Sequence, residues 1–188
     1  STGINGIRNF IYHHRWYKYI VKLYRSANGI FYMSDEMKRE LIRCGIQDNL
    51  VFFPNPVDTD KFCSLSIEEK NILKKENSLN QNLKVYLYMG RFEKVKNPML
   101  ILHAWTKLPM EIVQNSQLIM AGYGTLENEI TQFIKDQKLV NVSFVGRIDK
   151  TVDWYRMADV FVLPSNSEGL SNSLLEALSC GLGIISTK

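Results

Sequence analysis

Two cations and two carboxylates have types and spacings that could do chemistry in this sequence. Arg91 and Lys96 follow a short apolar segment and Gly90, on a loop where a guanidinium and an ammonium could neutralise a diphosphate. Glu168 and Glu176 lie eight positions apart, on a loop and on the helix after it, so both could face one pocket. Carboxylates accept hydrogen bonds from hydroxyl groups. The four residues therefore predict a site for a ligand that carries phosphates and sugar hydroxyls.

The helix that carries Glu176 adds to this prediction. Its first turn, at residues 171–174, would leave free N–H groups that suit a phosphate or another anion. Structural explanations stand beside the functional one. Glu176 could close a capping box with Ser173, and Glu168 could simply be solvated. Either cation, taken alone, is more often a solvated surface charge.

Regularly alternating segments would position these residues. Short apolar runs that predict buried strands lie at 85–89, 118–121, 142–145, 160–163 and 183–186. Segments with helical spacing lie between them, at 98–108, 126–138, 149–157 and 171–178. This alternation predicts an α/β fold, a Rossmann-like parallel sheet with helices on both faces. Both the cations and the carboxylates then follow the carboxyl ends of strands, where open α/β sheets bind ligands.

The residues before this alternation form a different part of the chain. We expect a strand at 29–33, a helix at 35–43 capped by Ser34, and a strand at 50–53. Pro54-Asn55-Pro56 follows, a stiff connector that no helix tolerates, and one architectural unit ends there. Residues 64–82 are polar and contain Lys70, Lys74 and Lys75, which is typical of a surface helix and linker.

Nothing in the sequence indicates a metal site. Asp58 and Asp60 have the spacing that some transferases use for a metal diphosphate, but no strand directly precedes them, and a turn is favoured. Cys44, Cys63 and Cys180 are odd in number and far apart, without CxxC spacing. They suggest neither a disulfide framework nor zinc, and they fit a reducing cytosol.

The length and the charge of the chain limit the class of protein to which it can belong. The 188 residues suffice for one ordinary domain and a remainder. No run is long enough to span a bilayer, and the first residues do not have the pattern of a signal peptide. The net charge of +4 conceals an asymmetry, because residues 1–34 contain five Lys or Arg residues and no acid.

A basic amphipathic helix is expected at residues 12–27. Its cationic face would hold Arg15, Lys18, Lys22 and Arg25, and its apolar face Trp16, Ile20, Leu23 and Ala27. One interpretation is a surface helix packed on a domain core. Another is peripheral contact with an anionic membrane face. Nucleic acid is not favoured, because no recognised nucleic-acid module accompanies the patch.

Several short motifs follow one another along the chain. They are Gly90-Arg91-Phe92 with Lys96-Asn97-Pro98, Ala121-Gly122-Tyr123-Gly124, Phe144-Val145-Gly146-Arg147, and Pro164-Ser165 with Glu168 and Glu176. This ordered set resembles the motifs of retaining GT-B glycosyltransferases of family GT4. Residues 29–62 resemble the end of that family's N-terminal domain and its linker, with Asn55-Pro56-Val57-Asp58 in place of the usual Asn-Gly-Val-Asp.

The resemblance implies a domain organisation. Residues 1–56 would be the tail of the N-terminal, acceptor-side domain, 57–83 the interdomain linker and helix, and 84–188 an incomplete Rossmann-like domain that binds the donor nucleotide. The chain would then be the C-terminal half of a GT-B fold, truncated at both ends. The family usually carries an active-site histidine in the N-terminal domain, and His13, His14 and His103 do not match it.

The same resemblance implies roles at the site. Arg91 and Lys96 would hold the donor diphosphate and stabilise the leaving phosphate. Glu168 would contact hydroxyls of the donor sugar, and Glu176 would accept the ribose hydroxyls. The other donor-binding residues would be Gly90, Gly122, Arg147, Ile148, Gly169, Leu170, Ser171 and Asn172. Retention is generally attributed in the family to front-face attack assisted by the leaving phosphate, and no metal or other cofactor is implied.

The implied function is transfer of a hexose-type sugar from a UDP- or GDP-linked donor to a glycan or lipid-linked acceptor. It would take place in the cytoplasm, at the cytosolic membrane face, and this chain alone would transfer little. One alternative is a non-catalytic module that binds a nucleotide sugar. Another is a GT-B-fold epimerase like the hydrolysing UDP-sugar 2-epimerases, which should lack the paired glutamates with the Arg and Lys loop.

Overall fold

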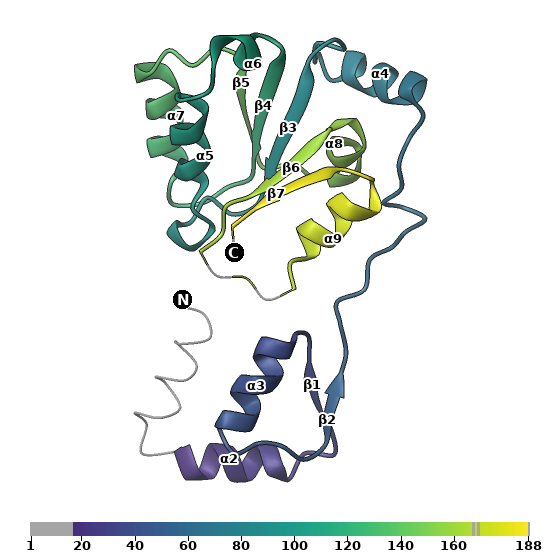
Figure 1. Cartoon of the computed structure of the whole chain (residues 1–188), viewed down its shortest axis with the longest axis vertical. Helices are drawn as coiled ribbons and strands as arrows, with labels where there is room; N and C mark the ends of the chain where they lie inside the picture. Colours follow the sequence, from purple (N-terminus) through teal and green to yellow (C-terminus); the bar gives the residue numbers. More distant parts are fainter. Residues whose placement is uncertain (1–16, 167, 169, 188) are drawn as a thin grey trace. The chain divides into compact units, whose positions relative to one another are not determined.

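The computed structural model describes residues 17–166, 168 and 170–187, and the chain divides into two compact units (Figure 1). The first unit runs to Pro56 and includes Ser167–Ser171. The second unit comprises Val57–Asn166 and Asn172–Lys188. The division therefore follows the Pro54-Asn55-Pro56 connector, where the chain cannot continue a helix.

The first unit contains a small parallel sheet. Its elements are α2 (Tyr17–Arg25), β1 (Ile30–Tyr32), α3 (Asp35–Arg43) and β2 (Leu50–Phe52). Ile30 pairs with Leu50 in the two-stranded sheet. Ser34 caps α3 as predicted, because its Oγ accepts a hydrogen bond from the Met37 N–H at 3.2 Å.

The core of the first unit shows which face of α2 is buried. Ile30, Cys44 and Ile46 are buried, and Val21 and Ala27 pack against them. The expected apolar face was wrong at one position, since Leu23 is 71% exposed. The helix ends at Arg25, so the turn after it, and not helical periodicity, brings Ala27 to the core.

The second unit is a larger α/β structure. Its elements are α4 (Ile67–Glu76), β3 (Lys84–Met89), η1 (Lys94–Lys96), α5 (Pro98–Trp105), α6 (Met110–Gln114), β4 (Ser116–Ala121), α7 (Glu127–Asp136), β5 (Val142–Gly146), α8 (Thr151–Met157), β6 (Val160–Leu163), α9 (Asn172–Ser179) and β7 (Gly183–Ser186). The strands form one parallel sheet in the order β5-β4-β3-β6-β7. This confirms the predicted fold class.

One helix is shorter than predicted. The segment 98–108 forms α5 only as far as Trp105, and α6 begins at Met110. Pro109 explains the break, because its nitrogen cannot donate and its ring disfavours helical backbone at Leu108.

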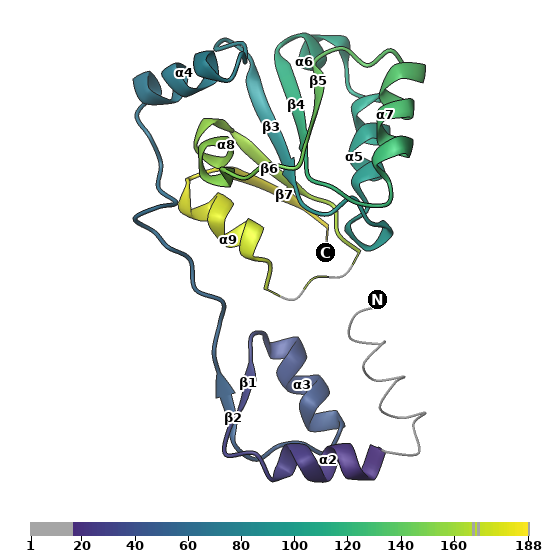
Figure 2. The same ribbon diagram turned by 180° about the vertical axis from the view of Figure 1, so that it is seen from behind.

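The two faces of the large sheet carry separate cores. Leu87 belongs to a cluster with residues of α8 and α9, whereas its neighbour Tyr88 belongs to a cluster with residues of α5 and α7. Successive strand residues point to opposite faces, so these helices must cover opposite sides of the sheet, as Figure 2 shows. The strands that follow β3 in sequence, β4 and β5, lie on one side of it, whereas β6 and β7 lie on the other. Open α/β sheets bind ligands at the carboxyl ends of strands beside such a switch point.

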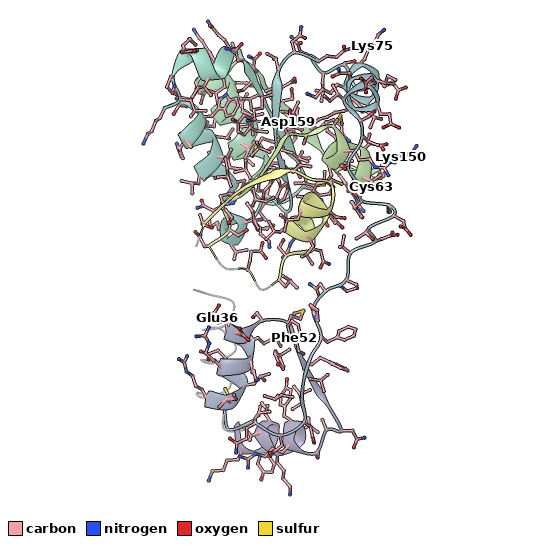
Figure 3. The ribbon with its side chains drawn as sticks, turned by 45° about the vertical axis from the view of Figure 1, so that its right-hand side comes forward. Glu36, Phe52, Cys63, Lys75, Lys150 and Asp159 are labelled. Atoms are coloured by element: carbon pink, nitrogen blue, oxygen red, sulfur yellow. The ribbon has the colours of Figure 1, made fainter. Side chains whose placement is uncertain are left out.

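An ionic network at the amino edge of this sheet surrounds Asp159, which lies just before β6 and is labelled in Figure 3. Its carboxylate accepts hydrogen bonds from Lys70 Nζ at 2.6 Å, Lys74 Nζ at 3.4 Å and the Val85 N–H at 2.7 Å. Burial alone would raise the pKa of Asp159, but these hydrogen bonds and charges prevail and lower it. Lys74 is only 4% exposed, so the expectation that the lysines of 64–82 lie on the surface was wrong there.

Candidate functional site

At the carboxyl edge of the sheet, glycines allow the turns after β3 and β4 to touch. A Cβ atom on Gly122 would lie 1.8 Å from the Gly90 carbonyl oxygen, and one on Gly124 would lie 2.6 Å from that of Phe92. Gly122 and Gly124 also have φ angles of 146° and 154°, at which the backbone of any residue with a side chain is strained. A Cβ atom on Gly90 would meet only the Tyr88 hydroxyl, at 3.4 Å. The structural need for glycine is therefore greater in the second turn than in the first.

A pocket of about 300 Å³ opens beside these turns. Five of the predicted donor-binding residues line it: Gly90, Arg91, Gly122, Arg147 and Ile148. The other lining residues are Met89, Ala121, Tyr123 and Thr151. The ends of β3, β4 and β5 and the start of α8 thus supply its walls, and the parallel sheet brings these distant segments of sequence together.

Arg91 and Arg147, the two cations of the pocket, are exposed. A tyrosine contacts the backbone of the first and the guanidinium of the second. The carbonyl oxygen of Arg91 accepts a hydrogen bond from the Tyr88 hydroxyl at 2.8 Å, which fixes the backbone after β3. The guanidinium of Arg147 lies over the ring of Tyr123, 5.3 Å from its centroid. The sequence contained Tyr123 within a predicted motif, but only the neighbouring placement of β4 and β5 reveals its contact with Arg147.

Lys96 lies outside the lining of this pocket. It ends η1, the half-buried turn that leads from β3 into α5. This turn is joined to the loop after β6, since the Asn166 N–H donates to the Val95 carbonyl at 2.9 Å. Asn97 Nδ2 and Asn166 Oδ1 are 3.4 Å apart. The turn that carries Lys96 is therefore fixed between the carboxyl ends of β3 and β6, outside the lining of the pocket.

Glu176 projects from α9 and is half-buried in the second unit. The capping-box alternative is wrong, because α9 begins at Asn172, which places Ser173 inside the helix. Burial raises the pKa of Glu176, and the Tyr155 hydrogen bond and the Lys61 charge only partly offset this effect.

The remaining predicted donor-binding residues lie in the loop before α9 and at its start. Glu168, Leu170 and Ser171 belong to the first unit, whereas the pocket and Glu176 belong to the second, so a shared pocket for Glu168 and Glu176 stays a prediction. Within the first unit, Asn55 Nδ2 donates to the Leu170 carbonyl at 2.8 Å. Asn172 is the exposed first residue of α9, and Gly169 lies outside the described residues.

Other predictions are settled by the surroundings of single residues. Asp58 makes a turn as expected, because its Oδ1 accepts a hydrogen bond from the Lys61 N–H at 3.0 Å. His103 is an exposed helix residue whose ring contacts Phe133, with 4.8 Å between centroids. His13, His14, Arg15 and Trp16 lie outside the described residues.

Two further findings concern metals and membranes. Within residues 17–166, 168 and 170–187, no cluster of three or more His, Cys, Asp or Glu side chains could hold a metal ion. In the same part of the chain, no helix is long and apolar enough to cross a membrane. The three cysteines are free thiols.

Comparison with known proteins gives a consistent family signal. Residues 69–188 match the family model of glycosyl transferases group 1. The chain is 30% identical over 117 residues to N-acetyl-alpha-D-glucosaminyl L-malate synthase of Bacillus anthracis, covering 62% of this chain and 30% of that protein. It is 28% identical over 176 residues to D-inositol 3-phosphate glycosyltransferase 2 of Catenulispora acidiphila, covering 87% of this chain and 40% of that protein. The chain thus spans less than half the length of these relatives.

Solved structures share the fold. The crystal structure of Anabaena Alr3699/HepE in complex with UDP superposes with a TM-score of 0.79 at 17% identity, covering 93% of this chain and 50% of that one. The same protein in complex with UDP-glucose superposes with a TM-score of 0.75 at 17% identity, covering 90% and 47%. At this identity the likeness shows the fold, which is that of GT-B glycosyltransferases.

Proposed function

The chain belongs to the glycosyl transferases group 1 family, and on that premise we propose that its second unit binds the nucleotide-sugar donor of a retaining sugar transfer. One observation carries this proposal. A pocket at the carboxyl ends of β3, β4 and β5 is lined by two exposed guanidinium groups and by closely packed glycine turns. Such a pocket suits an anionic ligand that approaches the backbone closely, as a nucleoside diphosphate does.

Arg91 and Lys96 would act on the diphosphate. Arg91 lines the pocket, and Lys96 lies five residues later on the same connection from β3 to α5, so we expect one diphosphate to contact both. Positive charge there stabilises the leaving phosphate most when the glycosidic bond breaks, because the negative charge is then largest. The proposal thus assigns charge neutralisation to side chains and requires no metal ion.

The other groups would fix the nucleoside and the sugar. Glu176 would accept hydrogen bonds from the ribose hydroxyls, and the backbone at Arg147 and Ile148 would face the nucleobase. Glu168 would contact hydroxyls of a hexose-type sugar. Backbone N–H groups at 170–172 would bind the sugar and phosphate.

The whole protein would transfer the sugar to a glycan or lipid-linked acceptor in the cytoplasm. Two relatives carry names of sugar-transferring enzymes, and structures of Anabaena Alr3699/HepE contain UDP or UDP-glucose. A non-catalytic module would bind the same donor, and an epimerase would convert it. An assay of the longer protein that follows both sugar transfer and epimerisation separates the three functions.

Isothermal titration calorimetry of UDP, GDP, UDP-glucose and GDP-mannose against this chain tests the donor site. We expect one nucleotide base to bind saturably, and Arg91→Ala to weaken that binding about ten- to a hundredfold through loss of a charge-assisted contact. Lys107→Ala removes an exposed cation from the turn after α5 and is the matched control. Equal weakening by both variants would mean that only net charge matters, and absence of any binding would contradict the proposal.

We further propose that the exposed side of α2 contacts an anionic membrane. Tyr19 and Leu23 are 67% and 71% exposed, one helical turn apart, and the exposed cations Lys18 and Lys22 lie next to them in sequence. Aromatic, aliphatic and cationic groups together are what the interface of an anionic bilayer binds. Peripheral attachment would bring the enzyme to a lipid-linked acceptor.

Co-sedimentation with phospholipid vesicles tests this surface. Binding to vesicles that contain phosphatidylglycerol should exceed binding to pure phosphatidylcholine. The double variant Lys18→Glu, Lys22→Glu should weaken it tenfold or more, at roughly 1 kcal/mol for each charge. Lys75→Glu, an exposed position on α4, is the control. Equal binding to both kinds of vesicle, or no effect of the double variant, would contradict the proposal.

A further inference from the structure

Glu93 lies on the connection from β3 to α5, between two cations of the proposed donor site. Arg91 is two residues before it, and Lys96 is three residues after it. The Glu93 carbonyl accepts a hydrogen bond from the Lys96 N–H at 2.9 Å, so the turn that carries Lys96 begins at Glu93. The position of Glu93 therefore determines where the backbone of this turn starts.

The side chain of Glu93 reaches across to the turn after β4. Its Oε2 atom accepts a hydrogen bond from the Thr125 hydroxyl at 2.9 Å, and its Oε1 atom accepts one from the Thr125 N–H at 3.3 Å. Hydrogen bonds to a charged acceptor are stronger than those between neutral groups. Because both oxygen atoms bind the same residue, the contact fixes the direction of the carboxylate as well as its distance.

A second carboxylate of the turn after β4 has a local role. Glu127 Oε1 accepts a hydrogen bond from the Gly124 N–H at 2.9 Å, at the start of α7. An acidic residue in the first turn of a helix commonly binds such an N–H group. Glu93, by contrast, lies 32 residues before Thr125 in the chain. Its contact therefore joins two separate connections of the sheet.

Backbone hydrogen bonds join the same two connections immediately before Glu93. The Phe92 N–H donates to the Tyr123 carbonyl at 2.8 Å, and the Leu126 N–H donates to the Phe92 carbonyl at 3.0 Å. The side chain of Glu93 continues this attachment by one residue, up to the start of η1.

The loop after β6 holds η1 as well, since the Val95 carbonyl accepts the Asn166 N–H at 2.9 Å. The turn that carries Lys96 is thus attached at its start through Glu93 and at its middle through Val95. A backbone attached at two points restricts where the side chains on it can reach.

We propose that Glu93 is a positioning residue of the donor site, whose carboxylate fixes the backbone from which Arg91 and Lys96 reach the diphosphate. This inference rests on the proposed function, because it takes these two cations as the diphosphate contacts. It adds a residue that is outside the lining of the pocket and that acts through its neighbours.

The charge of Glu93 alone predicts the opposite effect on binding. A carboxylate close to the cations repels a diphosphate, and UDP carries more negative charge than UMP. Removal of a carboxylate that contributed only charge should therefore strengthen the binding of UDP more than that of UMP. Removal of a carboxylate that positions the cations should weaken the binding of UDP more. The two roles thus predict changes of opposite sign.

Isothermal titration calorimetry of UDP and UMP at about pH 8 tests the role, or of GDP and GMP if guanosine is the base that binds. The phosphates of both ligands are fully ionised at this pH. The ratio of the two dissociation constants reports contacts to the second phosphate, because a change in folded fraction affects both ligands equally. We expect wild-type protein to prefer UDP by about ten- to a hundredfold, from charge-assisted hydrogen bonds.

Glu93→Gln keeps the size of the side chain but removes its charge and one acceptor oxygen, and it should lower the preference about threefold or more. Thr125→Val removes the hydroxyl at the other end of the contact and should lower the preference too. Thr125→Ser keeps a hydroxyl and should retain it. The double variant Glu93→Gln, Thr125→Val should resemble the stronger single variant, because both changes remove the same contact.

Glu129→Gln, at an exposed carboxylate of α7, is the control for charge. It removes one negative charge without touching the contact between the two connections, so it should not lower the preference for UDP. A preference lowered equally by Glu129→Gln and Glu93→Gln would overturn the positioning role.

The remaining outcomes separate this inference from the proposed function. If wild-type protein prefers UDP and Glu93→Gln keeps or raises that preference, the role of Glu93 is overturned while the donor site stands. Equal weakening of UDP and UMP by Glu93→Gln would mean a purely structural role and overturns it too. Because Thr125→Val breaks the same contact from the other side, an unchanged preference in that variant also counts against the role. If wild-type protein binds no nucleotide, the donor site itself is overturned, and the role of Glu93 with it.

Discussion

The two edges of the five-stranded sheet use charge in opposite ways. At the amino edge, Asp159 meets Lys70, Lys74 and a backbone N–H, so that each of these three charged side chains has a partner of opposite charge. At the carboxyl edge, Arg91 and Arg147 are exposed beside a pocket whose other lining residues include no carboxylate. One edge therefore uses ionic contacts to hold a helix to the sheet, and the other leaves positive charge exposed at a pocket.

The difference follows from how a parallel sheet is built. All strands run in the same direction, so the loops at their carboxyl ends collect on one edge and can vary without disturbing the pairing of strands. At the amino edge, the chain passes from a helix into the next strand, and the beginnings of the strands must be buried there. Substitutions at the amino edge should therefore change stability, and those of charged residues at the carboxyl edge should change binding.

The largest effect should come from a glycine contact at the carboxyl edge that serves both stability and binding. Gly122→Ala would place a Cβ atom 1.8 Å from the Gly90 carbonyl oxygen and would put alanine at a φ of 146°. We expect a loss of about 3 kcal/mol or more in unfolding free energy, together with loss of UDP binding, because β3 and β4 must separate at this edge. Thermal unfolding followed by circular dichroism measures the first and calorimetry the second.

Gly90→Ala is the matched control for this prediction. The added methyl group would meet only the Tyr88 hydroxyl at 3.4 Å, and Gly90 does not have a positive φ. We expect a change of less than about 1 kcal/mol. If both substitutions destabilise the protein equally, the close approach of the two turns is not what requires glycine.

The second prediction isolates the amino edge. Asp159→Asn leaves Lys74, which is 4% exposed, without its counter-charge, and should cost about 2 to 3 kcal/mol. UDP binding at a temperature where the variant is folded should not change. Chemical denaturation measures the loss of stability. Asp60→Asn, at an exposed carboxylate, is the control in that measurement. Loss of binding in the folded Asp159→Asn variant would show that the two edges are not independent.

Acidification should reproduce this effect in the wild-type protein. The pKa of Asp159 is lowered from its ordinary value of 3.8, so the folded state holds fewer protons on this group than the unfolded state. Its contribution is therefore complete above the unfolded value and disappears as the pH falls through the lower, folded value. The difference in stability between wild type and Asp159→Asn should shrink below about pH 4.

The sequence predicted most elements of both units because local rules determine them. Ser34 as a helix cap, the glycines after β4 and the apolar runs of the strands depend on residues near one another in the chain. Arg91 followed from the rule that the carboxyl ends of parallel strands meet at one edge, whereas Arg147 followed from the family resemblance. The motifs of a known family supplied the functional roles.

Contacts between side chains on different elements could not be predicted. The pairing of Lys74 with Asp159 joins α4 to the start of β6, and that of His103 with Phe133 joins α5 to α7. Neither pair has a fixed spacing in sequence, because the distance between partners depends on how whole helices pack. The polar segment around Lys74 therefore predicted a surface residue, although Lys74 is buried.

The smallest effect should come from Tyr123, which tests how the carboxyl edge holds a charge. Its ring lies under the Arg147 guanidinium at 5.3 Å and is itself 51% exposed. Tyr123→Leu should remove about 0.5 to 1 kcal/mol of cation–π attraction, which corresponds to UDP binding weakened about two- to fivefold by calorimetry. The melting temperature should hardly change, because the pair is exposed.

Tyr24→Leu, at another exposed tyrosine, should have no effect on UDP binding. An aromatic ring orients a guanidinium without neutralising its charge, so Tyr123 should matter for binding more than for folding. A loss of unfolding free energy larger than the loss of binding free energy would mean that Arg147 stabilises the fold, as the lysines at the amino edge do.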